Sequence, residues 1–348
     1  MGLNEKFFRS ADEDEGFFNT VLYDGTGVSN PITGVGFQPD LVWIKRRNTA
    51  AADHYIVDTV RGNGSNTYKN LASNEQQSEG TTTSSGITNS SIVDGGFTMQ
   101  GTGARTNANG SEYVAWCFKA GGAAVTNTDG SRTSQVSANV AGGFSIVRWS
   151  GNSVSGSTIG HGLGVAPELV IIKNLSNSLN WSVYSSPTGS GKKLILNSIA
   201  GEANTSNFVS TTPTGSVFSL SGGNEVNQTG SNYIAYCFHS VAGVSKVGSY
   251  TGANSSVVVP TGFEPAFVMI KFASGTTAVD YGGWLIYDNK RDTTNPVSVF
   301  LQANTDGTEF DNSSYSISFN STGGFTVGST QNDAINYDGN EYIYYAIA

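Results

Sequence analysis

The chain has 348 residues, of which 13% are charged, and its formal net charge at pH 7 is −9. A protein that binds nucleic-acid backbones needs a clustered basic surface, and a disordered chain has few aromatic residues, so a composition with 18 Phe and 15 Tyr argues against both classes. Gly is abundant at 44 residues, and short β-branched and aromatic runs recur between polar turns, which indicates an all-β protein.

Residues 1–16 are acidic, contain Phe7-Phe8 and are predicted to form a short N-terminal arm. They lack the apolar core of a signal peptide, so a cleaved secretory signal is not expected. No window approaches the roughly 20 apolar residues of a membrane span, so membrane insertion is not expected either.

Five kinds of segment each occur three times along the chain, in the same order, which divides the chain into three repeats. Two of these segments are strands in the first half of each repeat. One ends in a Gly turn, at residues 17–27, 144–151 and 245–252. The other begins near a Pro and continues as an apolar run to a Lys, at residues 36–45, 164–173 and 262–271. Pro is tolerated at the head of a strand, and a continuous apolar run predicts a strand that is covered on both faces.

The other three kinds of segment follow in the same order in each repeat. The third contains aromatic and β-branched residues, at 54–58, 180–184 and 283–288. The fourth alternates with a period of two, at 95–99, 215–220 and 323–327. The last is a polar Gly turn that leads into an aromatic strand, at 109–118, 229–238 and 338–347.

The copies are separated by about 100 residues, which is the size of a domain and longer than the repeats of solenoids and propellers. The sequence therefore predicts three sequential β-sandwich repeats, jelly-roll-like in form, after the N-terminal arm. Their bounds are 17–120, 144–240 and 244–348, with a polar linker at 121–143. This long linker predicts that the first repeat pivots, while the short second connection predicts a near-rigid pair of the second and third repeats.

Cys117 and Cys237 occupy the same position of the terminal strand, and Ala346 takes that position in the third copy. Cys, Cys and Ala together favour a slot for a small buried side chain. A disulfide would need the two Cα atoms within about 7 Å. Two equivalent positions in separately folded repeats are not expected to lie that close, so a disulfide is not favoured.

Several residues are candidates for a binding site, each with a structural alternative. His161 lies between two glycines, but Thr33 and Val259 take its place in the other copies, so a structural turn is favoured over a ligand site. The lysines that end the apolar strand are candidates for anion or glycan contacts, or for strand-end side chains that keep their charge in water. The second interpretation is favoured for all three: Lys45, Lys173 and Lys271.

Carboxylate pairs could support glycoside hydrolysis at separations of about 5–10 Å. The candidate pairs are Asp53 with Asp58 and Asp280 with Asp288, and solvated charges are the favoured interpretation. Segments 127–130 and 304–307 are similar to calcium loops but lack the full ligand pattern, which favours turns. No catalytic, cofactor-binding or metal-ligating residue is predicted, and the chain is not expected to be an enzyme.

Three tryptophans could stack on sugars. Trp149 aligns with Tyr23 and Tyr250, whereas Trp181 and Trp284 align with Tyr55. Aromatic residues at equivalent positions of repeats favour core packing. A glycan site is therefore expected in loops that have no counterpart, such as residues 63–74.

The repeated segments resemble a domain that is widespread in structural and tail proteins of tailed bacteriophages, especially marine ones. The resemblance covers nearly all of residues 17–348 and is carried by residues 157–174, 180–184, 233–238, 246–252 and 262–271.

The resemblance implies a virion structural protein that is assembled in the host cytoplasm and shaped as a fibre-like tail or surface appendage for host attachment. Implied partners are other virion proteins, host surface glycans and further copies of the chain in a homo-oligomer, with a trimer favoured. No nucleic acid and no cofactor is implied. A head decoration protein and an extracellular carbohydrate-binding or depolymerising protein remain as alternatives.

Overall fold

The structure is a computed structural model that describes residues 16–49, 51–62, 68–82, 85–88, 91–205, 211–275, 283–332 and 334–348. Apart from residue 16, the predicted N-terminal arm lies outside these residues. The described chain consists of antiparallel strands joined by turns, so the prediction of an all-β protein is confirmed. No helix in this part of the chain is long and apolar enough to cross a membrane.

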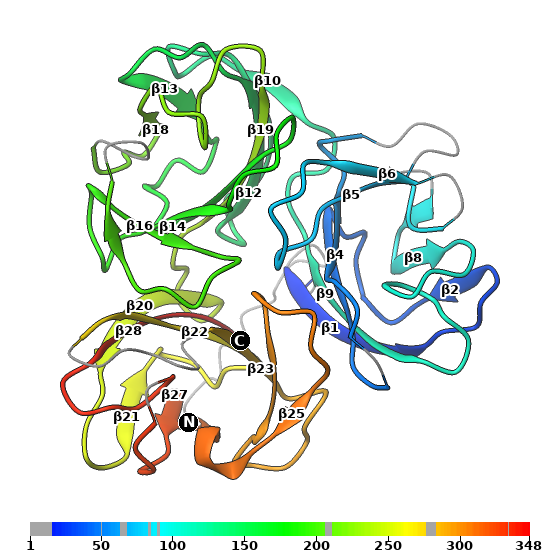
Figure 1. The fold of residues 1–348 in the computed structure, drawn as a ribbon, viewed down its shortest axis with the longest axis vertical. Helices are drawn as coiled ribbons and strands as arrows, with labels where there is room; N and C mark the ends of the chain where they lie inside the picture. Colours follow the sequence, from blue (N-terminus) through cyan, green and yellow to red (C-terminus); the bar gives the residue numbers. More distant parts are fainter. Residues whose placement is uncertain are drawn as a thin grey trace, which may run out of the picture.

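Three large sheets organise the chain and surround a common centre (Figure 1). The first is β1 (Phe18–Asp24), β9 (Glu112–Phe118), β3 (Leu41–Arg46) and β4 (Tyr55–Asp58). The second is β10 (Val125–Asn127), β11 (Ser134–Asn139), β12 (Phe144–Ser150), β19 (Asn232–Phe238), β14 (Leu169–Asn174), β15 (Ser182–Ser185), β16 (Lys192–Ile195) and β17 (Ala203–Asn204). The third is β20 (Ser245–Thr251), β28 (Glu341–Ile347), β22 (Phe267–Ser274), β23 (Trp284–Asp288), β24 (Val299–Gln302) and β25 (Phe310–Asp311).

A smaller sheet packs against each large one. These sheets are β2 (Asn30–Ile32), β8 (Gly96–Met99) and β7 (Ile92–Val93), then β13 (Ser157–Gly160) and β18 (Val217–Leu220), then β21 (Val257–Pro260), β27 (Gly324–Val327) and β26 (Ile317–Asn320). A hairpin of β5 (Tyr68–Asn70) and β6 (Gly80–Thr82) extends the first sheet through a bridge from Ile56 to Leu71. Each pair of sheets encloses its own hydrophobic cluster, which is β-sandwich packing.

The stretch predicted as a linker at 121–143 contains β10 and β11. Strand β11 pairs with β12 of the second sheet, and β10 pairs with β11 and forms the edge of that sheet. Alternate residues of β11, Val136 and Ala138, pack on the hydrophobic cluster of that sheet. This stretch is therefore part of the second sheet and not a free connection.

The last strand of each sheet is buried on both faces because it serves two cores. In β9, Tyr113, Ala115 and Cys117 face the cluster enclosed with the small sheet. The alternate residues Trp116 and Phe118, with Val114, face a cluster that all three large sheets share. Strands β19 and β28 divide their residues in the same way. The period of two in a β-strand thus explains the continuous apolar runs.

The shared cluster holds the three sheets together. Aromatic rings meet across it, with centroids 6.2 Å apart for Trp116 and Phe267, 5.9 Å for Phe118 and Phe238, and 4.8 Å for Phe238 and Tyr345. An apolar cavity of about 20 Å³ remains at its centre. Because the first sheet contributes a full share of this core, the prediction that the first repeat pivots is wrong.

Cys117 and Cys237 are free and buried, as predicted, and lie in separate clusters. Burial raises the pKa of both thiols, so they behave as small apolar side chains. The prediction that Trp149 is a core residue is also confirmed, because its ring stacks on Tyr233 at 5.4 Å.

Candidate functional site

The candidate site is the set of three seams where the large sheets meet. We call residues 71–79, 194–202 and 301–309 the seam segments. The first begins at the bridge residue Leu71, the second within strand β16 and the third within strand β24. Each seam segment lies against the end of an apolar strand from a neighbouring sheet, at 45–47, 173–175 or 271–273. The contacts repeat from seam to seam.

A buried lysine crosses each seam. Lys45 Nζ donates to the carbonyl oxygen of Asp306 at 3.0 Å, and Lys173 Nζ donates to that of Gln76 at 2.8 Å. Lys271 Nζ donates to the carbonyl oxygen of Ile199 at 2.6 Å. All three side chains lie on the strand face that points to the shared core, and each residue is 0% exposed. The prediction that these lysines keep their charge in water is therefore wrong.

A ring nitrogen crosses each seam beside the lysine. Trp181 Nε1 donates to the carbonyl oxygen of Ala72 at 2.9 Å, and Trp284 Nε1 donates to that of Ile195 at 3.0 Å. In the first sheet, continuing the register of β3 and β4 by one residue brings His54 opposite the strand-end lysine. Its Nε2 lies 3.0 Å from the carbonyl oxygen of Gln302. The alignment of Trp181 and Trp284 with Tyr55 is thus wrong by one residue.

His54 has a defined tautomer. The indole of Trp43 is only a donor, and its Nε1 lies 2.8 Å from His54 Nδ1. The Nδ1 atom must therefore accept, so Nε2 carries the hydrogen that is donated to Gln302. Burial, and then the charge of Lys45, holds the pKa of His54 well below its usual value. The neutral ring acts as the third sheet-to-sheet donor.

The backbone completes each seam. The amide of Glu79 donates to the carbonyl of Leu175 at 3.0 Å, and that of Glu202 donates to Ala273 at 2.7 Å. The amide of Glu309 donates to the carbonyl of Arg47 at 3.0 Å. The first sheet thus contacts the third, the third contacts the second and the second contacts the first, so the cycle of seams is closed.

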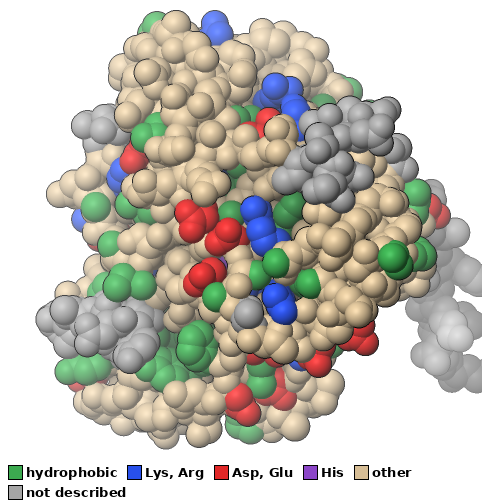
Figure 2. All heavy atoms as spheres, turned by 45° about the vertical axis from the view of Figure 1, so that its right-hand side comes forward, with side chains coloured by type: hydrophobic (Ala, Val, Ile, Leu, Met, Phe, Trp, Pro, Cys, Tyr) green, Lys and Arg blue, Asp and Glu red, His purple; other side chains and the backbone are tan. Residues whose placement is uncertain are grey.

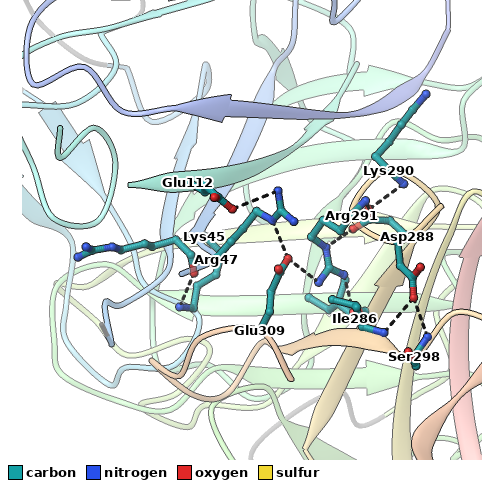
Figure 3. A network of polar contacts seen from close by, with 12 residues as sticks. Lys45, Arg47, Glu112, Ile286, Asp288, Lys290, Arg291, Ser298 and Glu309 are labelled. Atoms are coloured by element: carbon teal, nitrogen blue, oxygen red, sulfur yellow. Dashed lines mark hydrogen bonds and ion pairs between the residues drawn. The ribbon is translucent and has the colours of Figure 1, made fainter. Parts of the chain in front are cut away.

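Buried ion pairs reinforce the seam between the first and third sheets (Figure 3). Glu309 accepts from Arg47 Nε at 2.7 Å and lies 3.4 Å from Arg291 Nη1. Arg291 Nε binds the Oδ2 atom of Asp288 at 2.6 Å, and Trp116 Nε1 reaches the same oxygen at 3.1 Å. Two cations share these carboxylates, which compensates for the cost of burying the charges.

The seam between the second and first sheets has a similar network. Asp58 forms an ion pair with Arg61, and Arg61 Nη1 also lies 3.4 Å from Glu79 Oε1. The hydroxyl of Tyr236 donates to Asp58 at 2.8 Å. Burial, and then the charge of Asp58, raises the pKa of Tyr236 well above its usual value. At the third seam Ser185 takes the place of the aspartate, because it pairs with Leu169 as Asp58 pairs with Leu41.

The remaining predicted candidates are structural within the described residues. His161 is buried, its Nδ1 accepts from the amide of Leu163, and its Nε2 contacts the carbonyl of Thr214. Burial lowers the pKa of His161. Asn127 and Asp129 bind each other in a turn.

The described carboxylates of the candidate pairs bind neighbouring residues. Asp53 contacts Asn74, whereas Asp58 is used in the seam. Asp280 lies outside the described residues, as do residues 63–67 of the loop that was a candidate glycan site. No group of three His, Cys, Asp or Glu side chains that could hold a metal ion occurs in the part of the chain that the structure describes.

The sequence contains a pattern that marks the seam segments and that the apolar runs do not reveal. Each seam segment has Leu at its first position, Asn at its fourth and Glu at its ninth: Leu71, Asn74, Glu79, Leu194, Asn197, Glu202, Leu301, Asn304 and Glu309. The Asn side chains accept from the backbone amides of His54, Trp181 and Trp284. Asn therefore fixes the residue that donates across the seam.

A family model described as "Domain of unknown function (DUF7483)" matches residues 13–348. The chain has no match among curated proteins and none among solved structures.

Replacing Asp288 by Ser is expected to lower the free energy of unfolding by about 3–5 kcal/mol, because Arg291 is left buried without its partner. The second sheet has Ser185 and Thr188 at the corresponding positions, so Asp288→Ser combined with Arg291→Thr should recover part of that loss. Urea unfolding of the two variants measures the difference. A double variant that is no more stable than Asp288→Ser would contradict the role of the pair.

Lys271→Met is expected to weaken the pH dependence of stability. Burial lowers the pKa of Lys271 to about 7, whereas the ordinary value is 10.5. Between these values the unfolded chain binds more protons, so the free energy of unfolding rises with pH. From pH 7.0 to 8.5 the wild-type chain gains about 1–2 kcal/mol from this residue, and the variant lacks that gain. Equal gains in urea unfolding of the two proteins would refute the assignment.

Proposed function

The chain belongs to the DUF7483 family, and we propose that it is a structural protein of a bacteriophage virion. In this proposal it forms a fibre-like tail or surface appendage that contacts other virion proteins and the host surface. The resemblance of the repeated segments to phage structural domains supports this function. The observation that carries the proposal is the closed cycle of seams, through which one chain builds a three-part rigid body.

We further propose that this body consists of three copies of one jelly-roll-like sandwich, with bounds near 17–120, 144–240 and 244–348. Three similarities support the proposal. The large sheets share the order of first, last, second and third strand. The last strands divide their residues between two cores in the same way. Equivalent positions donate across each seam.

The use of charged groups favours scaffolding and binding over catalysis. Asp58, Asp288 and the three strand-end lysines are buried in the seams and hydrogen bonded there. Figure 2 shows acidic and basic side chains close together near the middle of the face in view, and most of the described side chains around them are neither acidic nor basic. A chain in which only 13% of the residues are charged, and whose sheets share one core, suits an exposed particle component.

A homotrimer remains our proposal for the assembled form. Three sheets around one core already fill the centre of each chain. Further copies would therefore associate through the outward faces, as they do in an appendage that is built from stacked or laterally joined rigid bodies.

Purified virions of a phage that encodes this chain are expected to contain it. Mass spectrometry of the particles detects the chain, and antibody labelling in electron microscopy places it on the tail or at another surface position. Labelling of the head would favour a decoration protein instead. Absence of the chain from intact particles, together with release of reducing sugars from a polysaccharide by the purified protein, would overturn the proposal in favour of a depolymerising enzyme.

A further inference from the structure

A hollow at the edge of the third sheet has a chemistry that the corresponding places in the other two sheets lack. It has a volume of about 270 Å³ and is lined by three aromatic and two amide residues: Phe300, Gln302, Phe310, Asn312 and Tyr315. Phe300 and Phe310 pair across strands β24 and β25. The pairs that correspond to Phe300 and Phe310 are Asn70 with Gly80 in the first sheet and Lys193 with Ala203 in the second.

The corresponding places in the other sheets are charged. In the first sheet a hollow of about 220 Å³ includes Asp53, Glu75 and Arg105 in its lining. In the second sheet Lys193 forms an ion pair with Glu225 at 2.5 Å. Since the strand pairing persists with such different side chains, it does not require an aromatic residue at Phe310, which lies outside the hydrophobic cluster that contains Phe300.

The aromatic rings form a fixed platform. Phe300 is 4% exposed and contacts Tyr287, with ring centroids 5.7 Å apart. Phe310 stacks on Phe300 at 5.5 Å with an interplanar angle of 16° and is itself 47% exposed. Tyr315 closes the side of the hollow, 5.6 Å from Phe300. An exposed ring on a buried support is a surface available for stacking.

The amide groups set the polarity of the ligand. Asn312 Oδ1 accepts from the amide of Ser314, which fixes that side chain beside the hollow. Neither Asn312 Nδ2 nor Gln302 Nε2 has a hydrogen-bond partner among the described residues. A purely apolar side chain in the hollow would strip water from these amides without replacing its hydrogen bonds.

We propose that this hollow binds one ring of a neutral sugar. The flat face of C–H groups of a pyranose stacks on Phe310, and the hydroxyl groups bind the two amides. No charged residue is among those that line the hollow, so sialic and uronic acids gain no ion pair there. The purified chain is sufficient for this binding; the assignment of the sugar to a host surface rests on the proposed virion function.

Calorimetric titration of the purified chain with a panel of neutral hexose and N-acetylhexosamine glycosides tests the site. Phe310→Ala should weaken binding by about tenfold through loss of the stacking contact. The matched control is Val258→Ala, because Val258 is 70% exposed on strand β21, and it should leave the affinity unchanged. Thermal unfolding of both variants checks that the fold is retained.

Absence of binding to any neutral sugar in the panel would overturn the site, as would binding that Phe310→Ala does not alter. Capture of an apolar peptide in place of a sugar would also overturn it. None of these results bears on whether the chain is present in virions. Conversely, absence of the chain from particles would overturn the virion proposal while the titration still reports on the hollow.

Discussion

The structure depends on burying both faces of the last strand in each large sheet. Tyr113 and Cys117 face one core while Trp116 and Phe118 face another, and β19 and β28 follow the same alternation. A sheet that is apolar on both faces must find a second layer on each side. The small sheets cover the outer faces, and the three large sheets cover one another around the shared cluster.

Polar groups at the edge of this shared core determine how the sheets meet. Each seam segment presents backbone carbonyl groups to the neighbouring sheet, and carbonyl groups that this contact removes from water require a donor. Lys45, Lys173 and Lys271 have stems long enough to supply one. The indoles of Trp181 and Trp284 supply a second donor, and neutral His54 supplies it at the remaining seam.

Much of the fold could be predicted from the sequence, because local patterns of apolar, polar and turn residues indicate the strands and their order. The apolar runs located β3, β14 and β22, and Cys, Cys and Ala at one position indicated a packing slot. The position of the lysines was also accessible: Lys45 has the same parity as Leu41 and Trp43, so it must point to the shared core. An exposed strand end was nevertheless the favoured interpretation, because no sequence pattern shows that another sheet covers it.

Other features depend on contacts between distant segments. The seam asparagines are separated from their backbone partners by about 20 residues or fewer, yet their importance comes from the neighbouring sheet. The polar composition of β10 and β11 concealed two strands at a sheet edge, where one face meets water. Phe310 is a single aromatic residue in a polar stretch of sequence, and only its pairing with Phe300 makes it part of a hollow.

The central claim is that one shared core makes the three sheets a single cooperative unit. Differential scanning calorimetry of the purified chain tests it most directly. We expect one transition in which the calorimetric enthalpy equals the van't Hoff enthalpy. Two or three resolved transitions, or a calorimetric enthalpy two to three times the van't Hoff value, would show that the sheets unfold independently and would contradict the account.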